Sequence, residues 1–165
     1  MEKAFTEPGI ELNNNNVDMA SNKIEKLIKL QLLKYARRRR LKSKSGYYIE
    51  IRKDGSVRGT LDPSSPYTSL QVMSIGSDMF AIWGSEAELY LSVDPDGTLK
   101  TSTNEGRQCV LIESLAPDFY SIYETYHSVF EGEPRCLVVK DNGDLGLSQN
   151  GVLPGRDGQF IWEIN

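Results

Sequence analysis

Two different patterns of hydrophobic and polar residues divide the chain near residue 40. Between residues 17 and 36, four apolar residues recur three or four positions apart: Ile24, Leu27, Ile28 and Leu32. This spacing places them on one face of an α-helix, and the lysines between them make that helix amphipathic. After Gly46, short stretches rich in valine, isoleucine, tyrosine and leucine alternate with glycine, proline, aspartate and asparagine. The second pattern predicts short β-strands joined by tight turns.

The β-rich part contains three copies of one pattern. Each copy is centred on a turn dipeptide, Asp54-Gly55, Asp96-Gly97 or Asn142-Gly143, and the three glycines are 42 and 46 residues apart. Such dipeptides predict type I′ hairpin turns, in which both central residues have a positive φ. Aliphatic residues recur six and four positions before each glycine and two after it: Ile49, Ile51, Val57, Leu91, Val93, Leu99, Leu137, Val139 and Leu145. The alternation before each turn is typical of half-buried strands.

Three repeats of about 40 residues predict an all-β fold of the β-trefoil type, a closed barrel with threefold pseudosymmetry. They are too few for a β-propeller, which has at least four blades. We expect the trefoil domain to span residues 41–165, after a basic extension over residues 1–40 that is partly helical and partly disordered. Four glycines and a proline after Gly143 predict a long irregular loop in the third repeat.

Charge changes near the same boundary. Residues 1–45 carry 11 lysines and arginines against 5 acidic residues, whereas residues 46–165 carry 8 against 18. The acidic body repels polyanions, so we expect no nucleic acid on the trefoil and assign any polyanion site to the basic run. This run consists of Arg37, Arg38, Arg39, Arg40, Lys42 and Lys44. It has four interpretations: a polyanion-binding arm, a nuclear address, a processing site after Arg40, or a solvated linker.

A longer motif runs through the second repeat. It consists of Gly97-Thr98-Leu99-Lys100-Thr101, then Cys109-Val110-Leu111-Ile112-Glu113, then Tyr120. In order and spacing the motif is similar to the signature of the fibroblast growth factors, with Gln108 at a position where that family has an acidic residue, asparagine or alanine. Residues 48–60 and 139–143 also resemble the family's first and third repeats. The resemblance covers residues 41–165 and implies a β-trefoil.

The resemblance also implies a contact with the ectodomain of a receptor tyrosine kinase. The family's receptor-contacting Tyr-Asn-Thr-Tyr segment corresponds to residues 120–123, and its Phe-Leu-Pro near the end corresponds to residues 162–164. The implied receptor contacts are Tyr120, Ser121, Tyr123, Trp162 and Glu163. Strand alternation puts Tyr120 and Tyr123 on opposite faces, so we expect at least one to be exposed, unless both cover the bottom of the barrel. For Trp162, the residues around it favour a place in the core.

In the resembling family, the loop after the third turn binds heparan sulfate through lysines and arginines. Here residues 141–150 contain no basic residue, and only Lys140 and Arg156 remain near that loop. A polyanion site requires several clustered cations. We therefore expect heparan sulfate binding to be weakened, or moved to the basic run.

The sequence contains few residues that could form a catalytic or metal-binding site. His127 is the single histidine, and the chain has neither a phosphate-binding GxxxxGK[ST] loop nor an HExxH pair. We expect no enzymatic activity, no cofactor and no metal site. Cys109 and Cys136 are predicted to be buried free thiols on strands of different repeats. For Trp83 the sequence allows two locations, a place in the core or an exposed position that could stack on sugars.

The same sequence leaves two classes of binding protein open. It has no apolar run long enough to span a membrane, and its first residues lack the pattern of a cleavable signal peptide. The resemblance implies an extracellular growth factor exported without such a signal. The alternative is a cytoplasmic or nuclear protein similar to the fibroblast growth factor homologous factors, which binds ion-channel tails or another partner. A lectin or actin-bundling trefoil is weaker, because the Gln-x-Trp repeats of ricin-type lectins are absent.

Overall fold

The computed structural model describes residues 22–28, 38–126, 134–149 and 151–164. Contacts divide the chain into two units, residues 1–36 and 37–165. In the first unit, residues 22–28 form a helix with exposed side chains, as the sequence predicts, and the remainder of the predicted extension up to residue 37 lies outside the described residues. Within the described part of the chain, no helix has the length and apolar character needed to cross a bilayer.

The second unit is built of strands. Within its described residues they are, in order, β1 (Arg39–Ser43), β2 (Tyr48–Ile51), β3 (Val57–Thr60), β4 (Leu70–Gly76), β5 (Met79–Gly84), β6 (Leu89–Val93), β7 (Leu99–Ser102), β8 (Leu111–Leu115), β9 (Ser121–Thr125), β10 (Leu137–Val139), β11 (Leu145–Leu147) and β12 (Phe160–Ile164). Three short 3₁₀ turns interrupt them: η3 (Pro66–Thr68), η4 (Arg107–Cys109) and η5 (Arg156–Gly158). The described residues between β11 and β12 hold only η5, so the long loop predicted in the third repeat is confirmed.

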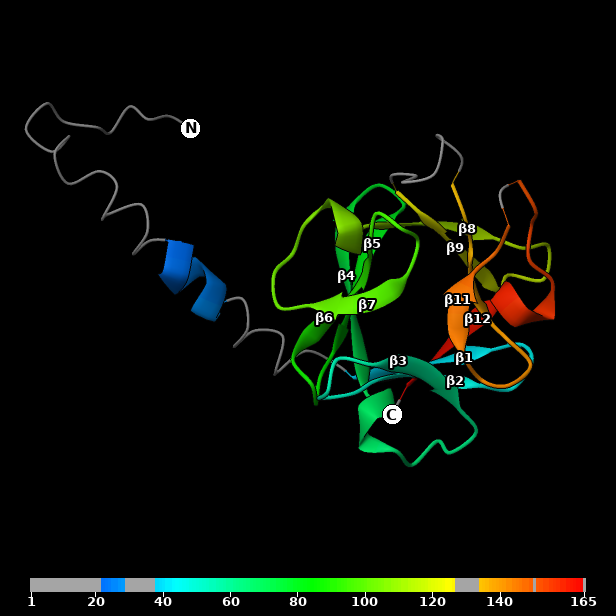
Figure 1. Cartoon of the computed structure of the whole chain (residues 1–165), viewed down its shortest axis with the longest axis horizontal. Coiled ribbons are helices and arrows are strands. Elements are labelled where there is room, and N and C mark those ends of the chain that lie inside the picture. The colour runs from blue at the N-terminus through cyan, green and yellow to red at the C-terminus, as the bar shows by residue number, and fades with distance from the viewer. Residues whose placement is uncertain (1–21, 29–37, 127–133, 150, 165) are drawn as a thin grey trace, which may run out of the picture. The chain divides into compact units, whose positions relative to one another are not determined.

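Antiparallel pairing closes the sheet into a barrel (Figure 1). β1 pairs with β4, β4 with β5, β5 with β8, β8 with β9, β9 with β12, and β12 returns to β1. The hairpins β2–β3, β6–β7 and β10–β11 are attached to this ring through β1, β5 and β9. Each of the three repeats, β1–β4, β5–β8 and β9–β12, therefore supplies one hairpin and two ring strands. This is the predicted β-trefoil, and the prediction is confirmed.

The three matched turns have the same backbone geometry. Gly55, Gly97 and Gly143 have φ values of 89°, 88° and 92°, a left-handed conformation that favours glycine. Their amides donate to the carbonyls three residues earlier over 2.8–2.9 Å, those of Arg52, Asp94 and Lys140. The residue before each glycine has no positive φ, so the turns are three-residue loops with one left-handed residue, not the type I′ turns that the dipeptides predict. The longer loop adds one residue and shifts the pairing by one, so that Ile51 lies opposite Val57.

The core is formed by the repeated aliphatic positions. All six residues that precede the turns in alternation are buried: Ile49, Ile51, Leu91, Val93, Leu137 and Val139. The three that follow the turns, Val57, Leu99 and Leu145, are partly buried and pack against the main cluster. A second, smaller cluster of Ala116, Ile122 and Cys136 lies against Tyr120. The repeat pattern therefore predicted the core positions correctly.

The barrel begins earlier than the predicted domain boundary at residue 41. β1 starts at Arg39, and its Arg39 and Arg40 pair with Ile164 and Glu163 of β12. Arg40 therefore lies inside a strand, where a protease that cuts after basic residues would need the strand to detach. The boundary was misplaced because Arg39 takes a position on the same face as Leu41 and Ser43, and a charged residue there hides the period of two.

Close packing at Gly84 allows a test of the core. A Cβ at this position would lie 2.8 Å from Cβ of Ile51, which is fully buried. We expect Gly84→Ala to reduce the free energy of unfolding by about 1–3 kcal/mol, measured by denaturant titration, because the core cannot make room. Gly106→Ala is the matched control: its Cβ would meet only Oε1 of the exposed Gln108, at 3.3 Å. The control should change stability by less than about 0.5 kcal/mol. Equal effects of the two variants would contradict this packing.

Candidate functional site

The predicted basic run is largely the outer face of strand β1. Leu41 and Ser43 are buried, whereas Arg40, Lys42 and Lys44 alternate with them and remain partly exposed. The period of two along a strand explains this arrangement, since alternate side chains point to opposite faces. Arg38 is exposed ahead of the strand, and Arg37 lies outside the described residues.

Two of these cations cover Tyr48. The guanidinium carbon of Arg40 and Nζ of Lys42 lie 5.7 Å and 5.4 Å from the centre of the Tyr48 ring. The hydroxyl of Tyr48 donates to Oε1 of Glu163 over 3.1 Å, and Nη1 of Arg40 donates to the carbonyl of Pro63 over 2.9 Å. The predicted contact residue Glu163 is therefore tied to β2 by a hydrogen bond. These contacts restrict the side chains of Arg40 and Lys42.

Arg38 and Arg40 also line a hollow in the surface. Its volume is about 460 Å³, and the other walls come from the segment between β3 and β4 and from Glu86. Several wall residues carry hydroxyl groups, namely Ser64, Ser65, Thr68 and Ser69. Two guanidinium groups beside hydroxyl donors are suited to an anionic group. The single carboxylate of Glu86 offsets part of that positive charge.

Three residues predicted separately meet at the end of β1. Lys44 forms an ion pair with Asp118, and its Nζ lies 4.9 Å from the centre of the Tyr120 ring. Nη2 of Arg156 donates to the carbonyl oxygen of Lys44 over 2.9 Å. The hydrogen bond from Lys44 lowers the pKa of the Asp118 carboxyl below its usual value. The structure thus joins Tyr120, from the implied receptor segment, to Lys44 of the basic run and Arg156 of the third-repeat loop.

The remaining implied receptor residues of this segment are buried. Tyr123 is fully buried and Ser121 is 8% exposed. The prediction of one exposed tyrosine holds only in part, because Tyr120 is itself half-buried. Strand β9 is covered on both faces: Tyr123 faces the main core, and Ile122 packs in the second cluster with Ala116 and Cys136. The alternation argument placed the two tyrosines on opposite faces, as observed, but it assumed one solvent-exposed face, and Tyr123 offers a partner no side-chain surface.

Instead, Tyr123 is the centre of a partly buried hydrogen-bond chain. Its hydroxyl donates to Oε2 of Glu113 over 2.8 Å and accepts Nε1 of Trp162 over 2.7 Å. Ser121 donates to the same Glu113 oxygen over 2.9 Å. Burial, followed by the hydrogen bond to Glu113, raises the pKa of Tyr123, so its hydroxyl stays protonated at neutral pH. Trp162 is half-buried against the main core, and this position agrees with the core interpretation of Trp162.

The loop of the third repeat carries mixed charge. Lys140 is exposed, but it is followed by the exposed Asp141 and Asp144, and Asp157 follows Arg156. In the pairings that the structure shows, the guanidinium of Arg156 is directed to the backbone carbonyl of Lys44, just after β1. This loop therefore does not present the dense cluster of cations that a strong polyanion site requires.

Other predicted candidates are structural. Cys109 and Cys136 are buried and free, and burial raises the pKa of both thiols, so they stay protonated. Trp83 is fully buried, so of its two possible locations the structure shows the core. Among the described residues, no three histidine, cysteine or carboxylate side chains are grouped as metal ligands would be. His127 lies outside the described residues.

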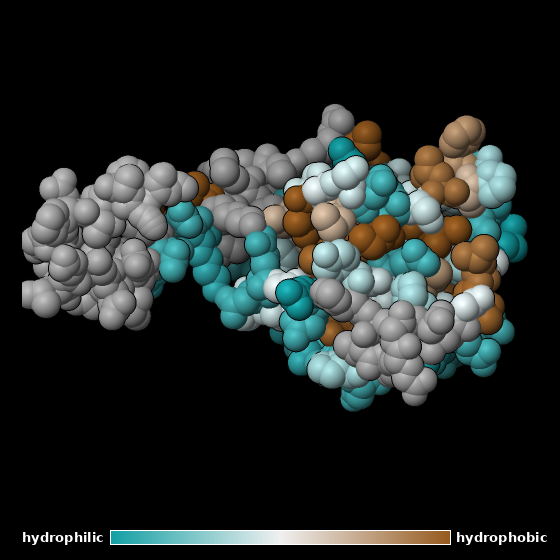
Figure 2. Space-filling view, turned by 90° about the horizontal axis from the view of Figure 1, so that it is seen from above, coloured by the Kyte–Doolittle hydropathy of each residue, from teal (hydrophilic) through white to brown (hydrophobic). Residues whose placement is uncertain are grey.

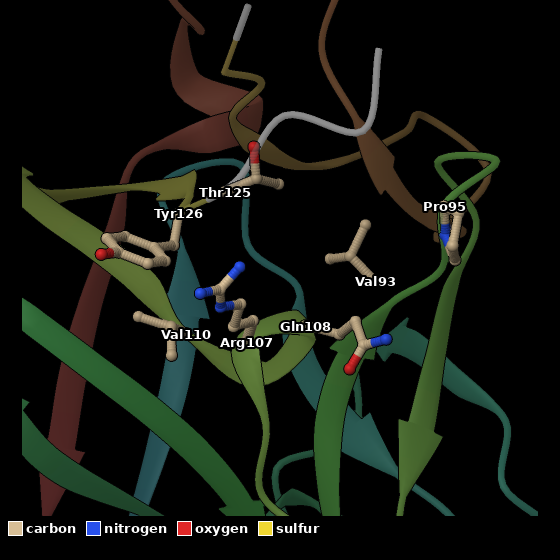
Figure 3. Close-up of a pocket in the computed structure, with 7 residues that line it drawn as sticks. All are labelled: Val93, Pro95, Arg107, Gln108, Val110, Thr125 and Tyr126. Atoms are coloured by element: carbon tan, nitrogen blue, oxygen red, sulfur yellow. The ribbon is translucent and has the colours of Figure 1, made fainter. Parts of the chain in front are cut away.

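One cavity was not predicted from the sequence. It measures about 360 Å³ and lies between the β6–β7 turn, η4 and the end of β9 (Figure 3). Val93, Val110 and Tyr126 form apolar walls, and the guanidinium of Arg107 projects between Tyr126 and Val93. Its residues come from three distant segments, so only the fold brings them together.

The buried chain through Tyr123 can be tested by removing one hydroxyl group. Tyr123→Phe leaves Nε1 of Trp162 without its acceptor and Glu113 without one donor. We expect the free energy of unfolding to fall by about 1–3 kcal/mol. Tyr120→Phe is the control, because the interaction seen for Tyr120 is through its ring and not through its hydroxyl. The control should stay within about 0.5 kcal/mol of the wild type in denaturant titration. If the two variants are equally stable, the hydrogen-bond chain does not stabilise the barrel.

Comparison with known proteins agrees with this geometry. The family described as "Fibroblast growth factor" matches residues 37–159, which include all the described strands except β12. The chain is 35% identical over 101 residues to "Fibroblast growth factor 1" of Notophthalmus viridescens, covering 61% of this chain and 75% of that protein. It is 34% identical over 106 residues to "Fibroblast growth factor 1" of Cynops pyrrhogaster, covering 64% of this chain and 70% of that protein. With the closed trefoil and the motif from Gly97 to Tyr120, these matches show that the chain belongs to the fibroblast growth factor family.

Proposed function

We propose that this protein is an extracellular signalling ligand that binds and activates a receptor tyrosine kinase through the surface around Tyr120. The observation that supports this most is the family match over the barrel, combined with the position of Tyr120 on its surface. Binding alone carries the function, and the proposal requires no catalytic group, cofactor or metal.

The contact surface follows the end of β1 and the β8–β9 hairpin. Tyr120 supplies a partly exposed ring, and tyrosine is a common anchor of protein interfaces. The ion pair of Lys44 with Asp118 limits the motion of that ring from one side. Glu163 and the exposed part of Trp162 extend the surface along β12. Ser121 and Tyr123 act from below, where their hydrogen bonds to Glu113 fix the hairpin strands.

Binding of receptor ectodomains tests this proposal. We expect purified full-length protein to bind at least one immobilised ectodomain of the fibroblast growth factor receptors saturably, and Tyr120→Ala to weaken that binding by about tenfold or more. Tyr67→Ala is a matched control, because Tyr67 is also half-buried beneath a cation, with Arg52 5.2 Å from its ring centre. The control should bind like the wild type.

Two results would contradict the proposal. Absence of saturable binding to every ectodomain, with and without heparan sulfate, would exclude the receptor-ligand function. Detection of the native protein in cytosol or nucleus but not in conditioned medium would favour the intracellular alternative.

We further propose that heparan sulfate binding is weak and depends on the β1 region more than on the third-repeat loop. Arg38, Arg40 and Lys42 lie on or beside one strand face, whereas Lys140 and Arg156 are each followed by an aspartate. Lys44 already forms an ion pair with Asp118. The remaining positive charge is therefore concentrated at the start of β1.

Heparin chromatography with two charge-matched variants distinguishes these locations. We expect the double variant Arg38→Gln, Lys42→Gln to elute at clearly lower salt than the wild type. Each lost contact between a cation and a sulfate group releases fewer counterions and so weakens binding. Lys140→Gln with Arg156→Gln removes the same charge and should shift elution less. A larger shift from the second pair would place the site on the loop. No retention of the wild type would show that the protein does not bind heparan sulfate.

A further inference from the structure

The β8–β9 turn departs from a rule that the molecule follows elsewhere. Among the described residues, five turns share two backbone hydrogen bonds: the fourth residue donates to the first, and the first donates to the fifth. The fourth residue is Gly46, Gly55, Gly97 or Gly143 in four of them, with φ between 88° and 110°. In the fifth turn this residue is Phe119, with φ of 69°. Its amide donates to Ala116 over 2.8 Å, and Ala116 donates to Tyr120 over 2.8 Å.

A phenylalanine is poorly suited to this position. The left-handed conformation crowds any side chain that has a Cβ atom, which is why glycine occupies the four equivalent turns. The other two described non-glycine residues with positive φ are acidic, Asp78 and Glu88, both at 59°. Short polar side chains such as that of aspartate tolerate this region better than aromatic ones do. Phe119 therefore stores backbone strain in the turn.

Packing within the protein does not compensate for that strain. The Phe119 side chain is 79% exposed, the largest exposed fraction among the large hydrophobic residues of the described chain. Leu115, at the end of β8 just before this turn, is 59% exposed. Hydrophobic residues form several separate patches on the visible face of the protein (Figure 2). Strain and exposure without internal benefit are typical of residues held for a functional contact.

The turn fixes the backbone that carries the ring. Its two hydrogen bonds define the backbone, and Asp118, next to Phe119, is held by its ion pair with Lys44. Tyr120 follows directly, beneath the same lysine. An aromatic side chain on an ordered turn loses little freedom when it binds, so a larger share of its contact energy contributes to affinity.

We propose that Phe119 is an anchor that inserts into an apolar pocket of the receptor ectodomain, beside the contact made by Tyr120. This inference rests on the proposed receptor-binding function and assigns a specific residue to it. The occupant is the receptor because Phe119 is continuous with the Tyr120 surface, and because the apolar ring is bordered by the Lys44–Asp118 ion pair, a polar rim around an apolar centre. The anchor favours receptors that have an apolar pocket at this place over those with a polar surface.

The test is a substitution with opposite effects on stability and binding. Phe119→Gly places in this turn the residue that the four equivalent turns carry, so we expect the unfolding temperature to rise by about 3 °C. Binding to the receptor ectodomain that binds the wild type should weaken by about tenfold or more. Asp78→Gly is the matched control: it relieves a positive φ in another turn and should leave receptor binding unchanged.

Each outcome decides between the proposals. If the wild type binds and Phe119→Gly binds equally well, the anchor is excluded while the receptor function stands. If the wild type binds no ectodomain, the proposed function fails and the anchor fails with it. A lower unfolding temperature for Phe119→Gly would overturn the strain argument. If the substitution instead abolishes a dimer in size-exclusion chromatography and leaves receptor binding intact, the ring contacts a second copy of the chain.

Discussion

Antiparallel pairing between β1 and β12 closes the barrel, and the remaining architecture depends on it. Five residue pairs join the two strands, from Arg39 with Ile164 to Ser43 with Phe160. Without them the ring of six strands becomes an open sheet whose edges are free. Leu41 and Phe160, both fully buried, contribute apolar surface to the core from the two sides of this junction. The candidate functional residues are attached to the same junction: Lys44 follows β1, and Trp162 and Glu163 belong to β12.

A second link ties this junction to the β8–β9 hairpin. Trp162 of β12 donates to Tyr123 of β9, which donates to Glu113 of β8. The chain of hydrogen bonds crosses three ring strands beneath the surface that carries Tyr120. A carboxylate in this position is tolerated because it accepts from both Ser121 and Tyr123. Core and candidate contact surface are therefore coupled: Tyr120 faces outward from a hairpin whose strands are fixed from within.

The repeated aliphatic positions and the turn glycines could be predicted from the sequence because they depend on local rules. Alternation needs only one buried face, and a left-handed residue in a tight turn favours glycine, as four of the five equivalent turns show. The half-burial of Tyr120 could not be predicted, because it depends on the second cluster around Ile122, which covers the other face of β9. The start of β1 was missed for a related reason. The basic run around Arg40 has no apolar alternation that marks a strand, and its pairing depends on β12 at the far end of the domain.

Closure of the barrel by β1 and β12 also sets when the protein can finish folding during its synthesis. The two strands lie at opposite ends of the domain, so their pairing spans more than a hundred residues of sequence, and contacts of such separation make folding slow. The ring cannot close until β12, which begins at Phe160, has been synthesised and has left the ribosome. Cys109 and Cys136 are buried in the finished barrel, and a chain that has not yet folded lacks that burial. The redox conditions met by the nascent chain therefore matter more to these thiols than the conditions in which the folded protein acts.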